Sequence, residues 1–400
     1  MSVIVTVRTE QPETSPLSRL VHLPLGLDVW ELAAGHAVLQ ASEAAVERLE
    51  RMGYTVEQLL PTERFLSDFA TEEAMTAYHS AATLEQDMRE LAERFPDIAE
   101  LHEIGRSVEN RPILALRIGE RKGSRTRLGF LGCHHAREWL AVEVPYLLAE
   151  FLLTQSATEP VATWLSTCEI WVAPMVNPDG HEHTRTTFRL WRKNRRRNPD
   201  GSIGVDPNRN YGYMWGTLDV NTSSHVPSDE TYVGPRAFSE PETRAVRDLI
   251  ARELFSGIIT YHSYSQLILY PWGYTADPIA DGADRAAMKA LAQRMKAQIV
   301  GVHGVDYTPQ QSAELYPTAG DTTDWTYGVY GIPSFTIELR PRTAMEGGFV
   351  LPASEIQPTF EENKPAAMEF ITSVLTAHPD AEPAAGTDTR LARRGVTSPR

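Results

Sequence analysis

Apolar and polar positions alternate along the first sixty residues in the way expected of short strands packed around one helix. Ser42 is a good N-cap and Gly53 a good stop for a helix over residues 42–52. We expect residues 1–70 to form a small α/β open sandwich, followed by a polar linker near residues 61–75. The predicted strands are "VIVTVR", "VWEL", "AVLQA" and "TVEQLL".

From about residue 75, apolar β-rich runs alternate with helical stretches. Thr83 and Gln86 give a capping-box signal before the helix "LEQDMRELAERF". The pattern predicts an α/β domain over residues 71–378, with a mostly parallel mixed sheet covered by helices on both faces. Residues 379–400 have almost no large apolar side chains and are expected to be disordered. The predicted strands are "PILALRIG", "RLGFLGC", "EIWVAPM", "SGIITYHS" and "PSFTIEL", and further helices are expected near 137–154, 241–254, 285–300 and 355–377.

Composition narrows the class of protein. The chain has 400 residues and a net charge of −15, which argues against non-specific binding to nucleic acid or to an anionic membrane. It contains no apolar run of about 18 residues that could span a membrane. The opening "MSVIVTVRTEQPE" lacks the basic and apolar regions of a signal peptide. Cys133 and Cys168 leave at most one disulfide, and buried thiols are the simplest expectation for both.

The stretch "GCHHAREW" brings candidate metal ligands to the start of a predicted helix. His135 and Glu138 are three residues apart, so both side chains can reach one ion. His134 is a competing ligand that spacing does not exclude. His262, at the end of a buried strand, supplies a further imidazole, which would be costly to bury without a partner. Two histidines and one glutamate form the ligand set of a catalytic zinc site with one open position.

Another histidine pair occurs in "DGHEH". His181 and His183 could in principle bind a metal, but no further ligand is near them in the sequence. We expect both in a solvent-exposed loop.

The order of these and other motifs resembles the zinc metallocarboxypeptidases of the carboxypeptidase A and B kind, over roughly residues 75–377. The resemblance assigns His135, Glu138 and His262 to Zn²⁺ and leaves His134 as a non-ligand. It implies that family's fold, one zinc ion per chain, and a monomer that hydrolyses the C-terminal bond of peptides and proteins. It is carried by "HAREW", "NPDG", "RLWRKNRR", "VDPNRN", "ETYVG", "HSYSQLILYPWGYT", "DWTYG", "IELR" and "GGFVLPASEI".

The resemblance also implies catalytic roles. Zinc lowers the pKa of bound water from about 15.7 to about 7, and a base must take up the proton. Glu338 matches the family's general base, although a strand-end salt bridge with Arg340 is the alternative reading. Arg192 matches the group that stabilises the oxyanion of the attacked carbonyl. The basic run at 185–197 could otherwise suggest nucleic-acid binding, which the acidic chain disfavours. Asp206 matches the acceptor that orients a zinc histidine.

Recognition of a free C-terminal carboxylate favours a guanidinium group, because its planar fork binds a carboxylate through two hydrogen bonds. Arg209 and Asn208, in "DPNRN", match the family's carboxylate clamp, and Tyr316 matches the tyrosine that closes over the bound terminus. Four further residues are expected to contact substrate: Arg137, Arg189, Tyr264 and Phe349.

The segment "PTAGDTTDW" matches the pocket for the terminal side chain. Thr323 stands where the family has an apolar residue in one branch and an acidic residue in the other. Asp321 can place a negative charge in the pocket, while Ala319 and Thr323 leave room for a large apolar group. We therefore expect broad specificity, for apolar or aromatic ends and also for Lys or Arg.

Residues 1–70 resemble the propeptide of the same family, which covers the active site until it is cleaved, so the chain is expected to be a zymogen. An unrelated α/β appendage is the alternative. The resemblance implies secretion, although the absence of a visible signal peptide leaves a cytoplasmic enzyme open. Two other functions remain: a peptidase of the same superfamily that cuts D- or γ-linked cell-wall peptides, and an inactive zinc-binding module.

Overall fold

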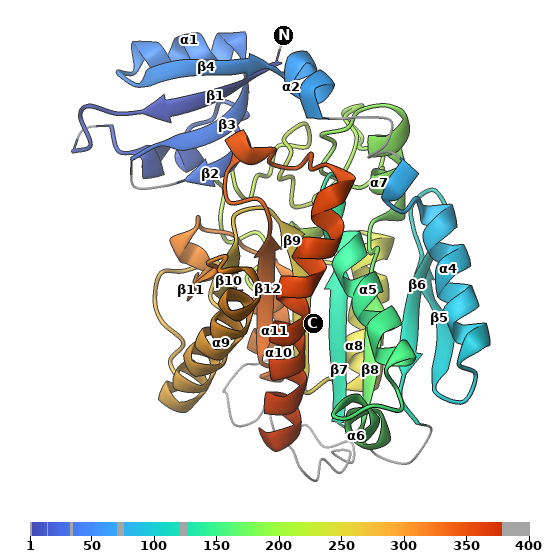
Figure 1. The fold of residues 1–400 in the computed structure, drawn as a ribbon. Helices are drawn as coiled ribbons and strands as arrows, with labels where there is room; N and C mark the ends of the chain where they lie inside the picture. The colour runs from blue at the N-terminus through green and yellow to red at the C-terminus, as the bar shows by residue number, and fades with distance from the viewer. Residues whose placement is uncertain (1, 14, 33–34, 70–75, 121–125, 378–400) are drawn as a thin grey trace.

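The structure is a computed structural model that describes residues 2–13, 15–32, 35–69, 76–120 and 126–377 (Figure 1). A small N-terminal domain lies against one end of a larger α/β domain (Figure 1). Residues 70–75 of the expected linker and the tail at 379–400 fall outside the described residues.

The N-terminal domain is built as the sequence pattern predicts. In its described part, an antiparallel sheet has the strand order β2-β3-β1-β4. Helix α1 connects β3 to β4 and packs against this sheet. Ser42 is the N-cap of α1, and its hydroxyl accepts a hydrogen bond from the amide of Ala45 at 3.2 Å. The elements are β1 (Ser2–Arg8), the 3-10 helix η1 (Leu17–His22), β2 (Asp28–Leu32), β3 (Ala37–Ser42), α1 (Glu43–Arg51) and β4 (Thr55–Pro61).

The segment directly after β4, which was expected to belong to a polar linker, forms helix α2 (Thr62–Phe69). The hydroxyl of Thr62 donates to the carbonyl of Ser2 at 3.0 Å and fixes the start of this helix. Leu66 packs against a cluster that includes Trp30. The acidic composition of the segment concealed this apolar contact.

The large domain contains, within the described residues, an eight-stranded sheet of order β11-β10-β12-β9-β7-β8-β6-β5. Four of the strand pairings are parallel and three antiparallel, which confirms the prediction of a mostly parallel mixed sheet. The strands are β5 (Ala99–Arg106), β6 (Pro112–Ile118), β7 (Thr126–Gly132), β8 (Cys168–Ala173), β9 (Gly257–Ser263), β10 (Leu267–Tyr270), β11 (Thr308–Gln311) and β12 (Ser334–Leu339).

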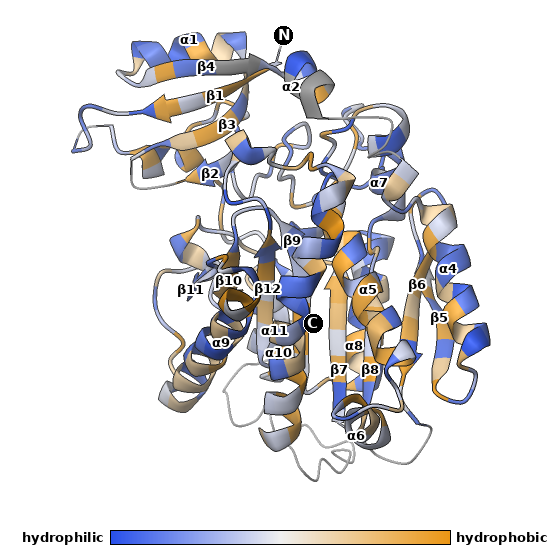
Figure 2. Cartoon of the chain, in the orientation of Figure 1, coloured by the Kyte–Doolittle hydropathy of each residue, from blue (hydrophilic) through white to orange (hydrophobic). Residues whose placement is uncertain are grey.

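Helices cover both faces of this sheet, as expected. One face packs against α4, α5, α9 and α11, and the opposite face packs against α8 and α10. Figure 2 shows hydrophobic residues along β7 and α5 in the middle of the domain. The helices are α4 (Ala81–Arg94), α5 (Leu140–Thr154), α6 (Val161–Thr167), α7 (Pro178–Thr186), α8 (Pro241–Glu253), α9 (Gly282–His303), α10 (Thr322–Tyr330) and α11 (Ile356–Ala377), with 3-10 turns η2 (Pro207–Arg209), η3 (Ser312–Glu314), η4 (Ala344–Glu346) and η5 (Ala353–Glu355).

The capping prediction for α4 needs a correction. The helix begins at Ala81, and its capping box is formed by Ser80 and Thr83 rather than by Thr83 and Gln86. The Ser80 hydroxyl accepts from the Thr83 amide at 3.1 Å, and the Ser80 amide donates to the Thr83 hydroxyl at 2.9 Å. None of the described helices is long and apolar enough to cross a membrane.

The sheet brings the sequence motifs together at one edge. Parallel strands β7, β9 and β12 lie side by side. Gly132 ends β7, and a Cβ atom there would collide with the carbonyl oxygen of Ala141, so only glycine lets the start of α5 approach this strand. On the neighbouring strands, His262 and Glu338 are directly opposite each other.

Candidate metal centre and active site

Three ligand atoms converge at this edge of the sheet. In His135, Glu138 and His262, one donor atom of each side chain lies within 4.8 Å of the others, and all three residues are buried. Nδ1 of His135 is 2.7 Å from Oε1 of Glu138, and Nδ1 of His262 is 2.9 Å from Oε2. The two Nδ1 atoms face each other at 3.1 Å, an arrangement that suits a shared cation. This donor set fits a zinc ion that keeps one position open.

A buried carboxylate supports the first ligand. Oδ1 of Asp206 lies 3.2 Å from Nε2 of His135. Burial by itself would raise the pKa of Asp206, but neighbouring positive groups, Arg192 foremost, hold this pKa well below its usual range. The Arg192 guanidinium contacts Oδ2 of Asp206 through Nε at 2.9 Å and through a terminal nitrogen at 2.8 Å. An ionised Asp206 fixes the ring of His135 with Nδ1 toward the metal position.

His134 points away from this centre. Its ring stacks behind that of His262, with the ring centroids 5.6 Å apart and the planes 18° apart. His134 is absent from the group of converging ligand atoms in the described part of the chain.

Glu338 stands next to the metal position on strand β12. Burial, followed by the negative charge of Glu138, raises its pKa well above the usual value of a glutamate, and a bound cation would oppose this shift. The alternative reading of Glu338 as the partner of Arg340 is wrong. Arg340 instead pairs with Glu355 at 2.8 Å and with Glu362 at 2.6 Å.

A small cavity of about 40 Å³ opens beside the metal position. Sequence reasoning did not single out five residues of its wall, because a motif does not tell which of its side chains face the cavity: Leu269, Ser312, Leu315, Thr318 and Thr336. The expected residues that line it are His135, Asn208, Arg209, His262, Tyr316, Asp321, Thr323 and Glu338.

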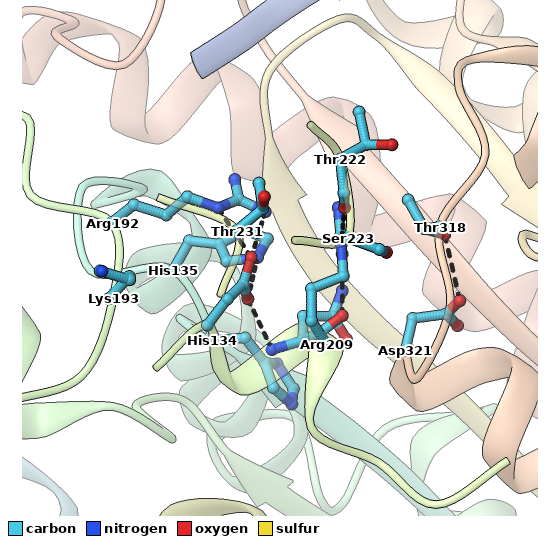
Figure 3. Close-up of polar contacts among 12 residues, drawn as sticks. His134, His135, Arg192, Lys193, Arg209, Thr222, Ser223, Thr231, Thr318 and Asp321 are labelled. Carbon is cyan, nitrogen blue, oxygen red and sulfur yellow. Dashed lines mark hydrogen bonds and ion pairs between the residues drawn. The ribbon is translucent and has the colours of Figure 1, made fainter. Parts of the chain in front are cut away.

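Backbone carbonyls hold Arg209 in place. Its Nε donates to the carbonyl of Thr222, and a terminal nitrogen donates to the carbonyl of Asn208 at 2.8 Å. Figure 3 shows Arg192 and His135 on one side of the site and Arg209 with Thr222 beside them. The Thr318 hydroxyl contacts Asp321 farther along the same view (Figure 3).

Several expected substrate contacts lie outside the cavity. Arg137 forms a two-pronged ion pair with Asp28 of strand β2, with nitrogen–oxygen distances of 2.5 and 3.1 Å. Arg189 donates to the carbonyls of Arg137 at 2.9 Å and of Phe349 at 2.7 Å. The rings of Tyr264 and Phe349 pack against each other with centroids 4.9 Å apart. These side chains gather near the N-terminal domain, and Ala319 is fully buried outside the cavity wall.

Both cysteines and His181 lie in the interior of the protein. Cys133 and Cys168 are buried and are not joined in a disulfide, as predicted. The prediction of an exposed loop at His181 is wrong, because this residue lies in α7 and is fully buried. Its Nε2 is 2.8 Å from the carbonyl of His79, and burial lowers the pKa of His181 to about 3.

Known proteins resemble this chain over most of its length. The zinc carboxypeptidase family model matches residues 84–366. Carboxypeptidase B of Astacus astacus is 36% identical over 297 residues, which cover 72% of this chain and 93% of the relative. Human carboxypeptidase B is 34% identical over 315 residues, or 77% of this chain and 73% of the relative.

A solved structure extends the likeness to the whole fold. The crystal structure of thrombin activatable fibrinolysis inhibitor matches with a TM-score of 0.79 and 25% identity, over 94% of this chain and 99% of its own. These matches favour neither a cell-wall peptidase nor an inactive module. The chain therefore belongs to the zinc carboxypeptidase family and is a zinc-dependent hydrolase that acts on the C-terminal ends of peptides.

Proposed function

We propose that Glu338, Arg192 and Arg209 carry out the chemistry and recognition of this carboxypeptidase. The observation that carries the proposal is the pairing of Glu338 with His262 on adjacent strands, beside a cavity that also contains Arg209. When held by His135, Glu138 and His262, zinc supplies an acidified water and a positive charge beside the scissile carbonyl.

The protein's own groups complete this arrangement. Glu338 takes the proton of the attacking water and passes it to the leaving amine. Arg192, fixed by Asp206, donates to the carbonyl oxygen as it gains negative charge. Asn208 and Arg209 bind the terminal carboxylate, and Tyr316 closes the cavity over it.

The carboxylate clamp gives a direct test. We expect Arg209→Lys to lower kcat/KM for free-acid peptides about 100-fold, because a lysine cannot form two parallel hydrogen bonds to a carboxylate. Peptides with a C-terminal amide should remain poor substrates of both enzymes. Release of C-terminal amino acids by wild-type and variant protein checks this, and an unchanged preference for the free acid would contradict the assignment.

The charge of Asp321 supports broad side-chain specificity. Its Oδ1 caps α10, accepting from the Asp324 amide at 2.8 Å and from the Thr323 hydroxyl at 2.9 Å. Its Oδ2 accepts a hydrogen bond from the Thr318 hydroxyl at 3.2 Å. Because this hydroxyl is neutral, the negative charge of Asp321 remains available in the cavity. Leu269 and Leu315 supply apolar wall for other terminal side chains. We therefore propose that apolar, aromatic, Lys and Arg ends are all accepted.

Asp321→Asn separates the charge from the capping role, since asparagine also caps helices well. We expect kcat/KM for peptides ending in Lys or Arg to fall about tenfold, the effect of roughly 1.4 kcal/mol. Values for peptides ending in Phe or Leu should change less than about threefold. Equal losses for all four ends would mean that the variant disturbs α10 rather than the charge of the pocket.

We also propose that the N-terminal domain restrains the enzyme as a propeptide. Its Asp28 pairs with Arg137, and its Trp30 packs on Phe349 with ring centroids 5.2 Å apart. The side chain of Asn221 donates to the carbonyls of Leu20 at 2.7 Å and Leu23 at 2.6 Å. These contacts cover the Arg137 side of the site and the chain next to Thr222, which holds Arg209.

Breaking the Asp28 pair tests this restraint. We expect full-length Asp28→Asn to cleave long peptides at least about tenfold faster than wild type, because removing one partner of a buried ion pair leaves the other charge uncompensated and weakens the closed arrangement. Glu57→Gln is a matched control, since Glu57 forms an exposed ion pair with Arg8 in the same domain. Equal rates for Asp28→Asn and wild type would contradict the proposed restraint. Secretion and a monomeric state stay predictions.

A further inference from the structure

His134 is a buried histidine without a role in the proposed chemistry. Its exposed fraction is 0%. Nε2 lies 2.9 Å from the hydroxyl of Tyr211 and 3.2 Å from that of Thr322, and Nδ1 lies 3.3 Å from that of Thr260. Thr260 belongs to β9 and Thr322 begins α10, so one imidazole links the strand of His262 to the helix of the specificity pocket.

The neighbouring hydrogen bonds suit a His134 ring that carries its proton on Nε2. Oδ1 of Asn208 accepts from the Thr322 amide at 3.0 Å and from the Thr322 hydroxyl at 2.8 Å. Because the hydroxyl proton is used there, Thr322 Oγ1 is an acceptor toward its other two neighbours, Nε2 of His134 and the hydroxyl of Tyr211. The tautomer with its proton on Nε2 can donate to Thr322 Oγ1, and its Nδ1 then accepts from the Thr260 hydroxyl.

The same bonds set the direction of the Asn208 amide. With Oδ1 bound by Thr322, the NH₂ group must face the other way. Its Nδ2 lies 3.5 Å from Nε2 of His262, on the side of the cavity that Asn208 lines with Arg209. An amide N–H donor in this position is what a terminal carboxylate of the substrate requires.

We propose that His134 is a positioning residue for the C-terminal carboxylate. Its Nε2–H bond holds the Thr322 hydroxyl with its proton on Asn208, and Asn208 then presents its NH₂ group beside Arg209. An apolar ring at this position would leave buried hydroxyls without a partner and free the Thr322 hydroxyl to turn. This inference rests on the proposed function of Asn208 and Arg209 as the carboxylate clamp.

The test compares variants that separate the donor from the ring. His134→Phe keeps a flat ring against His262 but loses the donor, whereas His134→Gln keeps a donor near the place of Nε2 but loses the ring. We expect His134→Phe to raise KM for an N-blocked free-acid peptide about tenfold with kcat changed less than about threefold, the pattern of lost uniform binding. His134→Gln should stay within about threefold of wild type in KM, and zinc content should remain near one per chain in both.

Thr322→Val removes the hydroxyl that lies between His134 and Asn208. This variant tests the same interaction if a His134 variant does not fold. We expect it to raise KM as His134→Phe does, and the double variant to be no worse than either single one. Additive effects, or equal damage from His134→Gln and His134→Phe, would overturn the proposal in favour of ring packing. Loss of zinc would overturn it in favour of a ligand role. A wild-type enzyme that does not distinguish free acids from amides would instead refute the carboxylate clamp.

Discussion

Replacing His262 with alanine is expected to abolish zinc binding and lower activity about 10⁴-fold or more, because the bound metal contributes several kcal/mol to transition-state stabilisation. Only His135 and Glu138 of the three converging side chains would remain. Zinc measured by elemental analysis should fall from one per chain to well below one. Chelator treatment should inactivate the wild-type enzyme reversibly and leave His262→Ala unchanged.

Zinc binding should also stabilise the fold. At a free zinc concentration 100 times Kd, the free energy of unfolding should rise by about 2.7 kcal/mol. Thermal unfolding with and without zinc should therefore shift in wild type and not in His262→Ala. His225→Ala is the matched control, since His225 is exposed and is expected to keep both zinc and activity. Full zinc occupancy of His262→Ala would contradict the assigned ligand set.

Glu338→Gln is expected to lower kcat about 10²- to 10⁴-fold, the usual range for loss of a general base. Glutamine has nearly the same shape but cannot take up the proton of the attacking water. Because Glu338 is not among the converging ligand atoms, zinc content should stay near one per chain. KM should change little, since the lost interaction develops in the transition state.

Single-turnover and steady-state kinetics on the zinc-loaded variant check this expectation. Glu346→Gln is a suitable control, because Glu346 is exposed in the 3-10 turn η4, beyond strand β12. A fall in kcat of less than about tenfold would exclude Glu338 as the general base. A loss of zinc from Glu338→Gln would assign it to the metal instead.

Local patterns in the sequence predicted most elements of the fold. Strand alternation and capping residues gave the N-terminal sheet and helix α1, since those signals depend on neighbouring residues only. Helix α2 escaped prediction because its start is fixed by Ser2, about sixty residues earlier in the chain. The burial of His181 was missed for a similar reason, since its partner His79 belongs to a distant segment.

In the active site, too, local features could be predicted from the sequence and long-range contacts could not. Motifs predicted eight of the residues that line the cavity, but the strand register that sets Glu338 opposite His262 depends on pairing between distant segments. Arg137 was expected to contact substrate, and its partner in this structure is Asp28 of the other domain. A sequence motif identifies the type of group a position carries and leaves the choice of long-range partner open.

Asn221 contacts the N-terminal domain through main-chain carbonyls of Leu20 and Leu23. Every residue has such a carbonyl, so these hydrogen bonds impose no requirement on the side chains at those two positions. At these two positions only packing in the N-terminal core restricts the side chain, whereas docking through Asp28 and Trp30 depends on the side chains themselves. In this one contact the required side chain lies on the large domain alone, and the small domain supplies only the path of its backbone.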